Sequence, residues 1–242
     1  MSTEPINYYK ADLRNLAFTL YEHLKVDELF THDLYSHLSR AECDQMIKES
    51  YRFATEVTGP LNGPGDRSGC KLEGGRVKTP KGFAEAWKQF YELGFPGFAM
   101  PQEWEGLGGP FCIYLALEEM VSGSNTSFNM YPGLSHGAMA LIEELALPED
   151  KKRFVPGLLS GRYSGTMCLS EPQAGSDVGA TRTRARKNDD GTYAIVGTKC
   201  WISCGDNDFS ENTLHLVLAR IEGASAGTKG LSLFIVPRLW VG

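Results

Sequence analysis

Apolar residues recur at helical spacing through the first two thirds of the chain. Over residues 8–24, leucines and an alanine recur every three or four positions, which is the period of an amphipathic helix. Ser39 followed by Glu42 has the pattern of a capping box, so a second helix is expected to begin there and run to about Val57. Glycine, proline and polar residues dominate residues 59–82, where a long surface excursion is expected. The predicted helices span residues 8–24, 39–57, 83–93, 110–121, 132–145 and 148–161.

Beyond Tyr163 the hydrophobic period changes from helical to two. Residues 181–186 alternate strictly between small residues and arginine, as expected for a strand with one face in water. Asp190 and Gly191 form a strong hairpin signal. Because a run of helices precedes a run of strands, the predicted fold class is α+β, with a boundary near Arg162. An all-helical N-terminal domain is expected, followed by an incomplete antiparallel β-barrel or sandwich domain. The predicted strands span residues 163–169, 181–186, 192–196, 214–220 and 230–237.

The composition indicates a folded globular protein and argues against a nucleic-acid-binding one. Of the 242 residues, 42% are hydrophobic and 22% are charged, which is typical of a chain with a packed core. The formal net charge is −6 and no basic block is present, which argues against nucleic-acid binding. Neither a signal peptide nor an apolar run long enough to span a bilayer is visible, so a cytoplasmic location is expected.

The cysteines do not form a recognisable metal or disulfide pattern. None of the six belongs to a Cys-x-x-Cys pair, which is typical of scattered free thiols. Cys200 and Cys204, with His215 as the nearest imidazole, supply only half of a zinc site. No metal site is therefore predicted.

Two segments end predicted strands with a hydroxyl-bearing residue. The first, residues 167–177, reads Met-Cys-Leu-Ser-Glu-Pro-Gln-Ala-Gly-Ser-Asp. Pro172 stops the strand because it lacks an N–H for the ladder, and Gly175 is expected to permit a turn that a residue with Cβ would resist. The second segment, residues 197–205, reads Gly-Thr-Lys-Cys-Trp-Ile-Ser-Cys-Gly. Such strand ends expose backbone N–H groups and a side-chain hydroxyl, which can receive a planar polar ligand or belong to a plain loop.

Together these segments resemble the acyl-CoA dehydrogenase family. Cys-Leu-Ser-Glu-Pro at residues 168–172 is similar to that family's Cys-Val-Thr-Glu-Pro segment, and Lys-Cys-Trp-Ile-Ser at residues 199–203 to its Lys-Met-Trp-Ile-Thr segment. Residues 101–109 and 227–237 also resemble family motifs, and residues 8–16 resemble the N-terminal extension of its longer members. The resemblance implies a helical extension over residues 1–35, a helical domain over 36–162 and a truncated middle β-domain over 163–242.

The resemblance also implies FAD and acyl-CoA as ligands. The backbones of Met167 and Leu169 and the hydroxyl of Ser170 would meet the flavin ring, Trp201 would lie against it, and Ser203 would bond its polar edge. Gly175 and Ser176 would contact the acyl-CoA. Ser170 and Ser203 replace the commoner threonines, which keeps the hydroxyl and loses a methyl group.

Each of these residues also has a plainer interpretation. Trp201 could be a core residue, Ser170 a turn cap, and Glu171 a brace for its own loop. His136, where the family often has a histidine, is expected to be a packed helix residue rather than a catalyst. Glu118 and the adjacent Glu119 point in different directions on a helix, so they are not expected to act as a pair.

The implied reaction is α,β-dehydrogenation of an acyl-CoA thioester, but no catalytic residue is assigned in this chain. In the family a glutamate of a C-terminal helical domain removes the α-proton, and that domain is absent here. The chain is therefore interpreted as the N-terminal part of a longer, homo-oligomeric enzyme, dimeric or tetrameric, that passes electrons to an electron-transfer flavoprotein or a similar acceptor. The fragment alone is expected to be inactive. The alternatives are a flavin-dependent acyl-CoA oxidase and a non-catalytic scaffold with the same fold.

Overall fold

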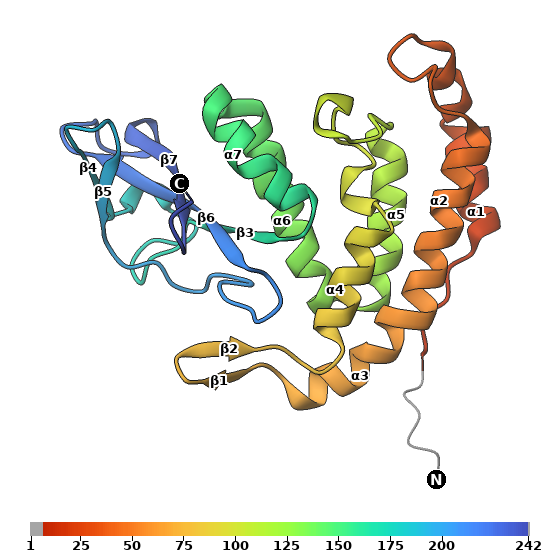
Figure 1. Ribbon diagram of the computed structural model, residues 1–242, viewed down its shortest axis with the longest axis horizontal. Helices are drawn as coiled ribbons and strands as arrows, with labels where there is room; N and C mark the ends of the chain where they lie inside the picture. Colours follow the sequence, from red (N-terminus) through yellow and green to blue (C-terminus); the bar gives the residue numbers. More distant parts are fainter. Residues whose placement is uncertain (1–6, 242) are drawn as a thin grey trace.

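A row of helices stands beside a small curled sheet in this computed structural model, which describes residues 7–241 (Figure 1). This arrangement confirms the predicted order of a helical N-terminal part and a strand-rich C-terminal part. Residues 1–6 of the predicted extension, and Gly242, lie outside the described residues. None of the helices between residues 7 and 241 is both long and apolar enough to cross a membrane.

Helix α2 (Arg40–Phe53) begins where a local sequence signal predicts its cap. The hydroxyl of Ser39 accepts a hydrogen bond from the backbone N–H of Glu42, whose carboxylate accepts one from the Ser39 N–H at 2.7 Å, so the predicted capping box is present. The first helix continues past Ala17 as a wider π-helical turn, Phe18–His23. The helices are α1 (Leu13–Ala17), α2 (Arg40–Phe53), α3 (Gly59–Ser68), α4 (Phe83–Glu92), α5 (Phe111–Ser124), α6 (Thr126–Leu145) and α7 (Pro148–Leu159).

Two features of the helical part differ from the prediction. Residues 59–82 contain α3 and a hairpin of β1 (Lys71–Glu73) and β2 (Arg76–Lys78), so strands do pair within the first 150 residues. The hairpin turns at two glycines with positive φ, at positions 74 and 75. Helix α6 begins six residues before the predicted start at Pro132, because the side chain of Asn125 caps the helix and the proline is accommodated inside it.

The sheet is mixed, which corrects the prediction of a purely antiparallel domain. Its long strand β6 (Asn212–Ile221) runs parallel to β3 (Tyr163–Cys168) and to β4 (Arg184–Lys187), and antiparallel to β7 (Leu231–Pro237). Strand β5 (Tyr193–Val196) pairs antiparallel with β4 in the predicted hairpin. Alternation along a strand predicts its buried face but not its partner. The parallel pairing arises because the excursion after β3 returns the chain to the end at which β3 began.

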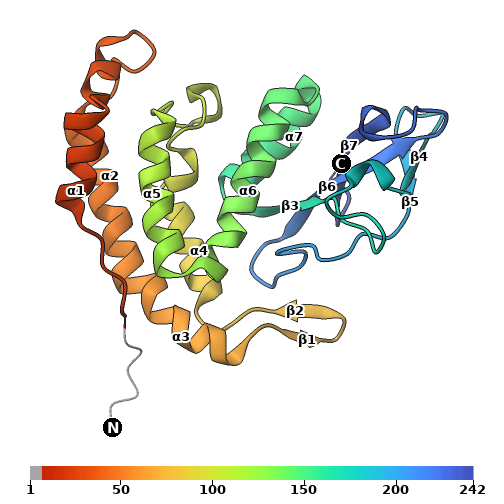
Figure 2. The same cartoon turned by 180° about the vertical axis from the view of Figure 1, so that it is seen from behind.

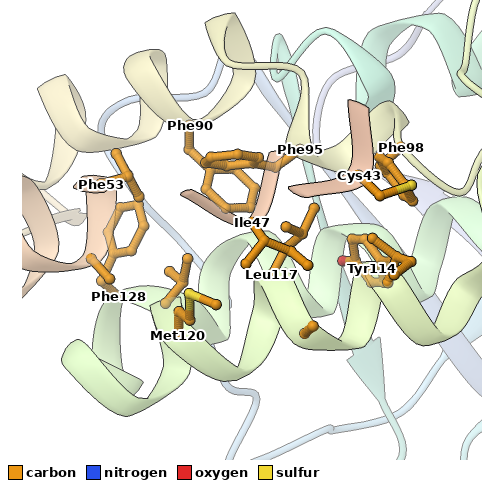
Figure 3. Packing of buried hydrophobic residues seen from close by; sticks show 14 of the residues in the cluster. Cys43, Ile47, Phe53, Phe90, Phe95, Phe98, Tyr114, Leu117, Met120 and Phe128 are labelled. Atoms are coloured by element: carbon orange, nitrogen blue, oxygen red, sulfur yellow. The ribbon is translucent and has the colours of Figure 1, made fainter. Parts of the chain in front are cut away.

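Two apolar cores hold the molecule together. The larger fills the helical row, where Phe53, Phe90 and Phe128 meet with ring centroids 5.8–6.4 Å apart (Figure 3). The smaller lies between α6, α7 and the sheet, where Met139 and Leu216 are both buried. This second core fixes the direction of β3, which leads out from beneath α6 in both views (Figures 1 and 2). The first of the two segments singled out above begins at the end of β3.

Candidate functional site

The two segments predicted to carry the chemistry lie against each other. The backbone N–H of Cys200 donates to the carbonyl of Ser170 at 3.0 Å. The ammonium of Lys199 donates to the carbonyl of Leu169 at 2.9 Å. Residues about 30 positions apart are thereby joined at the end of β3, and we call this place the motif junction (residues 167–177 and 197–205).

Glu171 is the internal anchor of the motif junction. Its side chain is nearly inaccessible to solvent, and its carboxylate accepts hydrogen bonds from Lys199 Nζ at 2.9 Å, from Arg182 N at 2.8 Å and from Thr183 N at 3.0 Å. Burial alone would raise the pKa of this carboxyl, but the Lys199 ammonium and the other donors outweigh burial and hold the pKa well below its usual range. Glu171 therefore braces its own loop. A carboxylate with so low a pKa, and with its oxygens already hydrogen-bonded, is a poor base at neutral pH.

Trp201 lies at the outer surface of the motif junction. Its side chain is 90% exposed, which contradicts the alternative that it is a core residue of this chain. Its φ of 60° is in the left-handed region, as is the φ of 57° at Cys204. Such a conformation in a bulky residue costs about 1–3 kcal/mol and is usually found where the surrounding structure serves a function.

The hydroxyls of Ser170 and Ser203, at the motif junction, have no hydrogen-bond partner among residues 7–241. The Ser170 side chain is half-buried and that of Ser203 is exposed. Two free donors and an uncovered indole suit a flat ligand with a polar edge, such as a flavin. The observed groups therefore fit the ring that the resemblance implies.

The remaining predicted contacts take different positions. Met167 packs on the second core, while the carbonyl of Leu169 is already occupied by Lys199. Gly175 and Ser176 are exposed on the adjoining loop. The expected conformational role of Gly175 is wrong, because its φ is not positive and an added Cβ would meet nothing within 4 Å.

The other carboxylates and histidines that were considered lie elsewhere. Glu118 accepts a hydrogen bond from Asn129 Nδ2 at 2.9 Å between α5 and α6, and burial raises its pKa despite that bond. His136 stacks on Tyr114 with ring centroids 4.2 Å apart, and burial lowers its pKa to about 4. Within residues 7–241, no group of three or more His, Cys, Asp or Glu side chains is arranged to hold a metal ion.

Sequence reasoning missed the contact that fixes the far end of the second segment. Arg76 of β2 donates through Nε and Nη2 to both carboxylate oxygens of Asp206, which lies 130 residues further along the chain. The only signal in the sequence is a charge match. Basic residues at 76 and 78 alternate along a strand, and acidic residues at 206 and 208 alternate with the same spacing.

Comparison with known proteins identifies the family. The model of the acyl-CoA dehydrogenase N-terminal domain matches residues 72–162, and that of the middle domain matches residues 166–242. The chain is 41% identical over 238 residues to a 3-methylmercaptopropionyl-CoA dehydrogenase of Ruegeria pomeroyi, covering 97% of this chain and 40% of the relative. It is 36% identical over 246 residues to a butyryl-CoA dehydrogenase of Syntrophomonas wolfei, covering 96% of this chain and 39% of the relative.

A solved structure of the same family has a similar fold. The chain superposes with a TM-score of 0.62 and 26% identity on an acyl-CoA dehydrogenase complexed with FAD from Bacillus anthracis, covering 81% of this chain and 30% of that one. The chain spans about 40% of the length of the curated relatives it matches. It belongs to the acyl-CoA dehydrogenase family.

Proposed function

We propose that the chain is the N-terminal part of an FAD-dependent acyl-CoA dehydrogenase that desaturates the α,β bond of an acyl-CoA thioester. The observation that carries the proposal is the motif junction, where the exposed indole of Trp201 and the unpartnered hydroxyls of Ser170 and Ser203 lie on two loops that Lys199 joins. In this proposal residues 1–35 are an N-terminal extension, residues 36–162 the helical domain, and residues 163–242 part of the middle β-domain.

The motif junction has suitable groups for the flavin ring. The hydroxyls of Ser170 and Ser203 would donate to its polar edge, Trp201 would cover its apolar surface and exclude water, and the backbones of Met167 and Leu169 would line the site. FAD, when bound, supplies the two-electron acceptor. Donors at the polar edge of the ring also tune its reduction potential, so the two serines would influence the chemistry as well as the affinity.

The substrate is proposed to reach the neighbouring loop. Gly175 and Ser176 are exposed beside the motif junction and would contact the acyl-CoA. The two curated relatives are named for different acyl groups, so we assign the substrate class as an acyl-CoA thioester without naming its acyl group.

No carboxylate at the motif junction is assigned as the base. Glu171 is engaged by several donors and stays ionised, so it holds its loop and takes no part in moving the α-proton. Because the curated relatives are more than twice as long as this chain, we propose that the base lies outside residues 1–242. An electron-transfer flavoprotein or similar acceptor, and assembly into a dimer or tetramer, complete the proposal.

The test uses the purified full-length protein. We expect the visible absorbance of oxidised flavin, and reduction of an artificial dye that depends on added acyl-CoA. Fast oxygen consumption without the dye would identify an acyl-CoA oxidase instead. Absence of flavin absorbance after reconstitution with FAD would overturn the proposal and favour the non-catalytic scaffold.

A further inference from the structure

The second segment of the motif junction is held at both ends, and Cys204 near its C-terminal end packs against the helical core. Residues 197–205 form neither helix nor strand. At the N-terminal end, Lys199 and Cys200 bond to the loop after β3. Trp201 and Ser203, in the middle, are exposed. The position of these two side chains therefore depends on what fixes the chain on either side of them.

The β1–β2 hairpin makes the polar contacts that orient the C-terminal end of this segment, and Phe209 just beyond it packs on Trp87 and Tyr131. Arg76 Nε donates to Asp206 Oδ2 at 2.8 Å, and Arg76 Nη2 donates to Asp206 Oδ1 at 2.7 Å. The same Nη2 atom donates to the carbonyl of Asn207 at 2.9 Å, and the N–H of Val77 donates to Asp206 Oδ2 at 2.9 Å. A bidentate guanidinium–carboxylate pair with an added backbone donor fixes orientation as well as distance.

A second set of bonds extends the contact along the hairpin. Thr79 donates to Asp208 Oδ1 through its hydroxyl at 2.7 Å and through its N–H at 3.2 Å. Lys78 Nζ lies 3.6 Å from Asp208 Oδ2. The hairpin itself packs little apolar surface, since Leu72 is exposed, and it extends from α3 beneath the loop that precedes β6 in both views (Figures 1 and 2). Its contacts with residues 206–208 are thus mainly directional polar bonds.

We propose that the β1–β2 hairpin is a positioning element for the flavin site, and that Arg76 is the positioning residue that sets the place of Trp201 and Ser203 through Asp206. The inference rests on the proposed function for the identity of the ligand. Arg76 does not touch that ligand in this proposal. Its effect is transmitted through the backbone of residues 201–205. Trp201 and Cys204 in this stretch have left-handed backbone conformations, and we expect a more mobile loop to lose them.

Two further observations support this role. The Asp206 side chain is only 21% exposed, and burial alone would raise the pKa of its carboxyl. The hydrogen bond from Arg76 instead lowers the pKa of Asp206 to about 2, with the Val77 N–H adding to the effect. The geometry also requires arginine, because lysine has a single point of attachment and lacks the planar fork that engages both carboxylate oxygens.

The experiment compares Arg76→Lys and Arg76→Ala with wild type in the full-length protein. Hydrogen–deuterium exchange of residues 197–208 is measured without FAD, and the FAD dissociation constant and the flavin reduction potential are measured with it. We expect faster exchange confined to these residues, FAD binding weakened roughly tenfold in both variants, and a shifted potential, while the thermal midpoint changes little. A merely structural role would lower the midpoint and leave the potential of bound flavin unchanged.

The matched control is Lys88→Ala, which removes an exposed ion pair with Glu92 on α4 and is expected to change none of these quantities. Asp206→Asn, which keeps the shape and removes the charge, should reproduce the effect of Arg76→Lys if Arg76→Ala folds poorly. Unchanged exchange and unchanged FAD affinity in Arg76→Lys and Asp206→Asn would overturn the inference. If wild type binds no FAD, the proposed function fails, and the exchange measurement still decides whether the hairpin fixes the loop.

Discussion

At the scale of single residues, the motif junction combines a buried carboxylate that has several hydrogen-bond donors with exposed side chains that have no partner in the described part of the chain. Glu171 and Lys199 form a pair whose side chains are only 2% and 11% exposed. Outside this pair stand Trp201, 90% exposed, and the free hydroxyl of Ser203. In the proposed function, the buried pair contributes rigidity and the outer groups contribute recognition of the ligand. Substitutions in the buried pair should therefore lower the free energy of unfolding, whereas substitutions of the exposed groups should mainly weaken ligand binding.

Glu171→Gln should destabilise the protein without contacting any ligand. Removing one partner leaves Lys199 buried without its counter-ion, which costs roughly 3–5 kcal/mol. Because the folded-state pKa of Glu171 is depressed, its stabilising contribution is present above the unfolded-state pKa of about 4.5 and is lost as the pH falls toward the folded-state value. The difference in free energy of unfolding between variant and wild type should thus be constant near neutrality and shrink below about pH 4.5.

Urea unfolding of the full-length protein at several pH values measures this difference. The control is Glu211→Gln, which breaks an exposed pair with Arg162 and should cost less than about 1 kcal/mol at every pH. An equal, pH-independent loss in both variants would show that the Glu171 network does not carry the expected energy.

Trp201→Ala should have the complementary effect. Because the side chain is exposed, the free energy of unfolding should change by no more than about 0.5 kcal/mol. Loss of an aromatic contact of about 0.5–1.5 kcal/mol should weaken FAD binding roughly two- to tenfold. Fluorescence titration with FAD measures the affinity. Trp240→Ala, another exposed indole with no proposed flavin contact, should leave it unchanged. Equal FAD affinity in Trp201→Ala and wild type would remove Trp201 from the site.

At the scale of elements, the sequence predicted helix caps and turns, but beyond the hairpin at Asp190-Gly191 it did not predict which strands pair. The capping box at Ser39 and the hairpin at Asp190-Gly191 were found because their signals lie within four residues. The start of α6 was misplaced because Pro132 was interpreted as a first-turn proline, whereas the stronger cap is Asn125. Hairpin β1–β2 was missed because its strands are three residues long and contain no buried residue, which leaves no hydrophobic period to detect.

The same limit applies to the candidate site. Residues 167–177 and 197–205 were linked through a family resemblance, and the structure adds the bonds that join them. The partner of Asp206 was not predictable, because a pair 130 residues apart leaves no local pattern. Parallel pairing of β3 with β6 was unpredictable for the same reason, since the residues of a strand do not indicate the direction of its neighbour.

At the scale of the whole molecule, α6 and β3 make a close backbone approach where the helical row meets the sheet. The N–H of Gly165 in β3 donates to Ser135 Oγ of α6 at 2.9 Å. An added Cβ at Gly165 would lie 2.5 Å from the Cβ of Ala138 and 3.1 Å from the Cα of Ser135. Glycine is therefore required here for the packing distance between the two parts. Because the motif junction follows directly on β3, the contact at Gly165 also sets the distance between the motif junction and α6.

Gly165→Ala should therefore affect stability and ligand binding together. Forcing a methyl group into this contact should cost about 1–3 kcal/mol, because α6 and β3 must move apart. That movement displaces Leu169 and Ser170, so FAD affinity should fall as well. Chemical denaturation and FAD titration of the full-length protein measure the two effects. The matched control is Gly137→Ala on the same helix, where an added Cβ meets nothing within 4 Å and helix propensity predicts a gain of up to about 1 kcal/mol. If the two alanine variants behave alike, the contact at Gly165 does not set the distance between helices and sheet, and the site is held by the loop contacts alone.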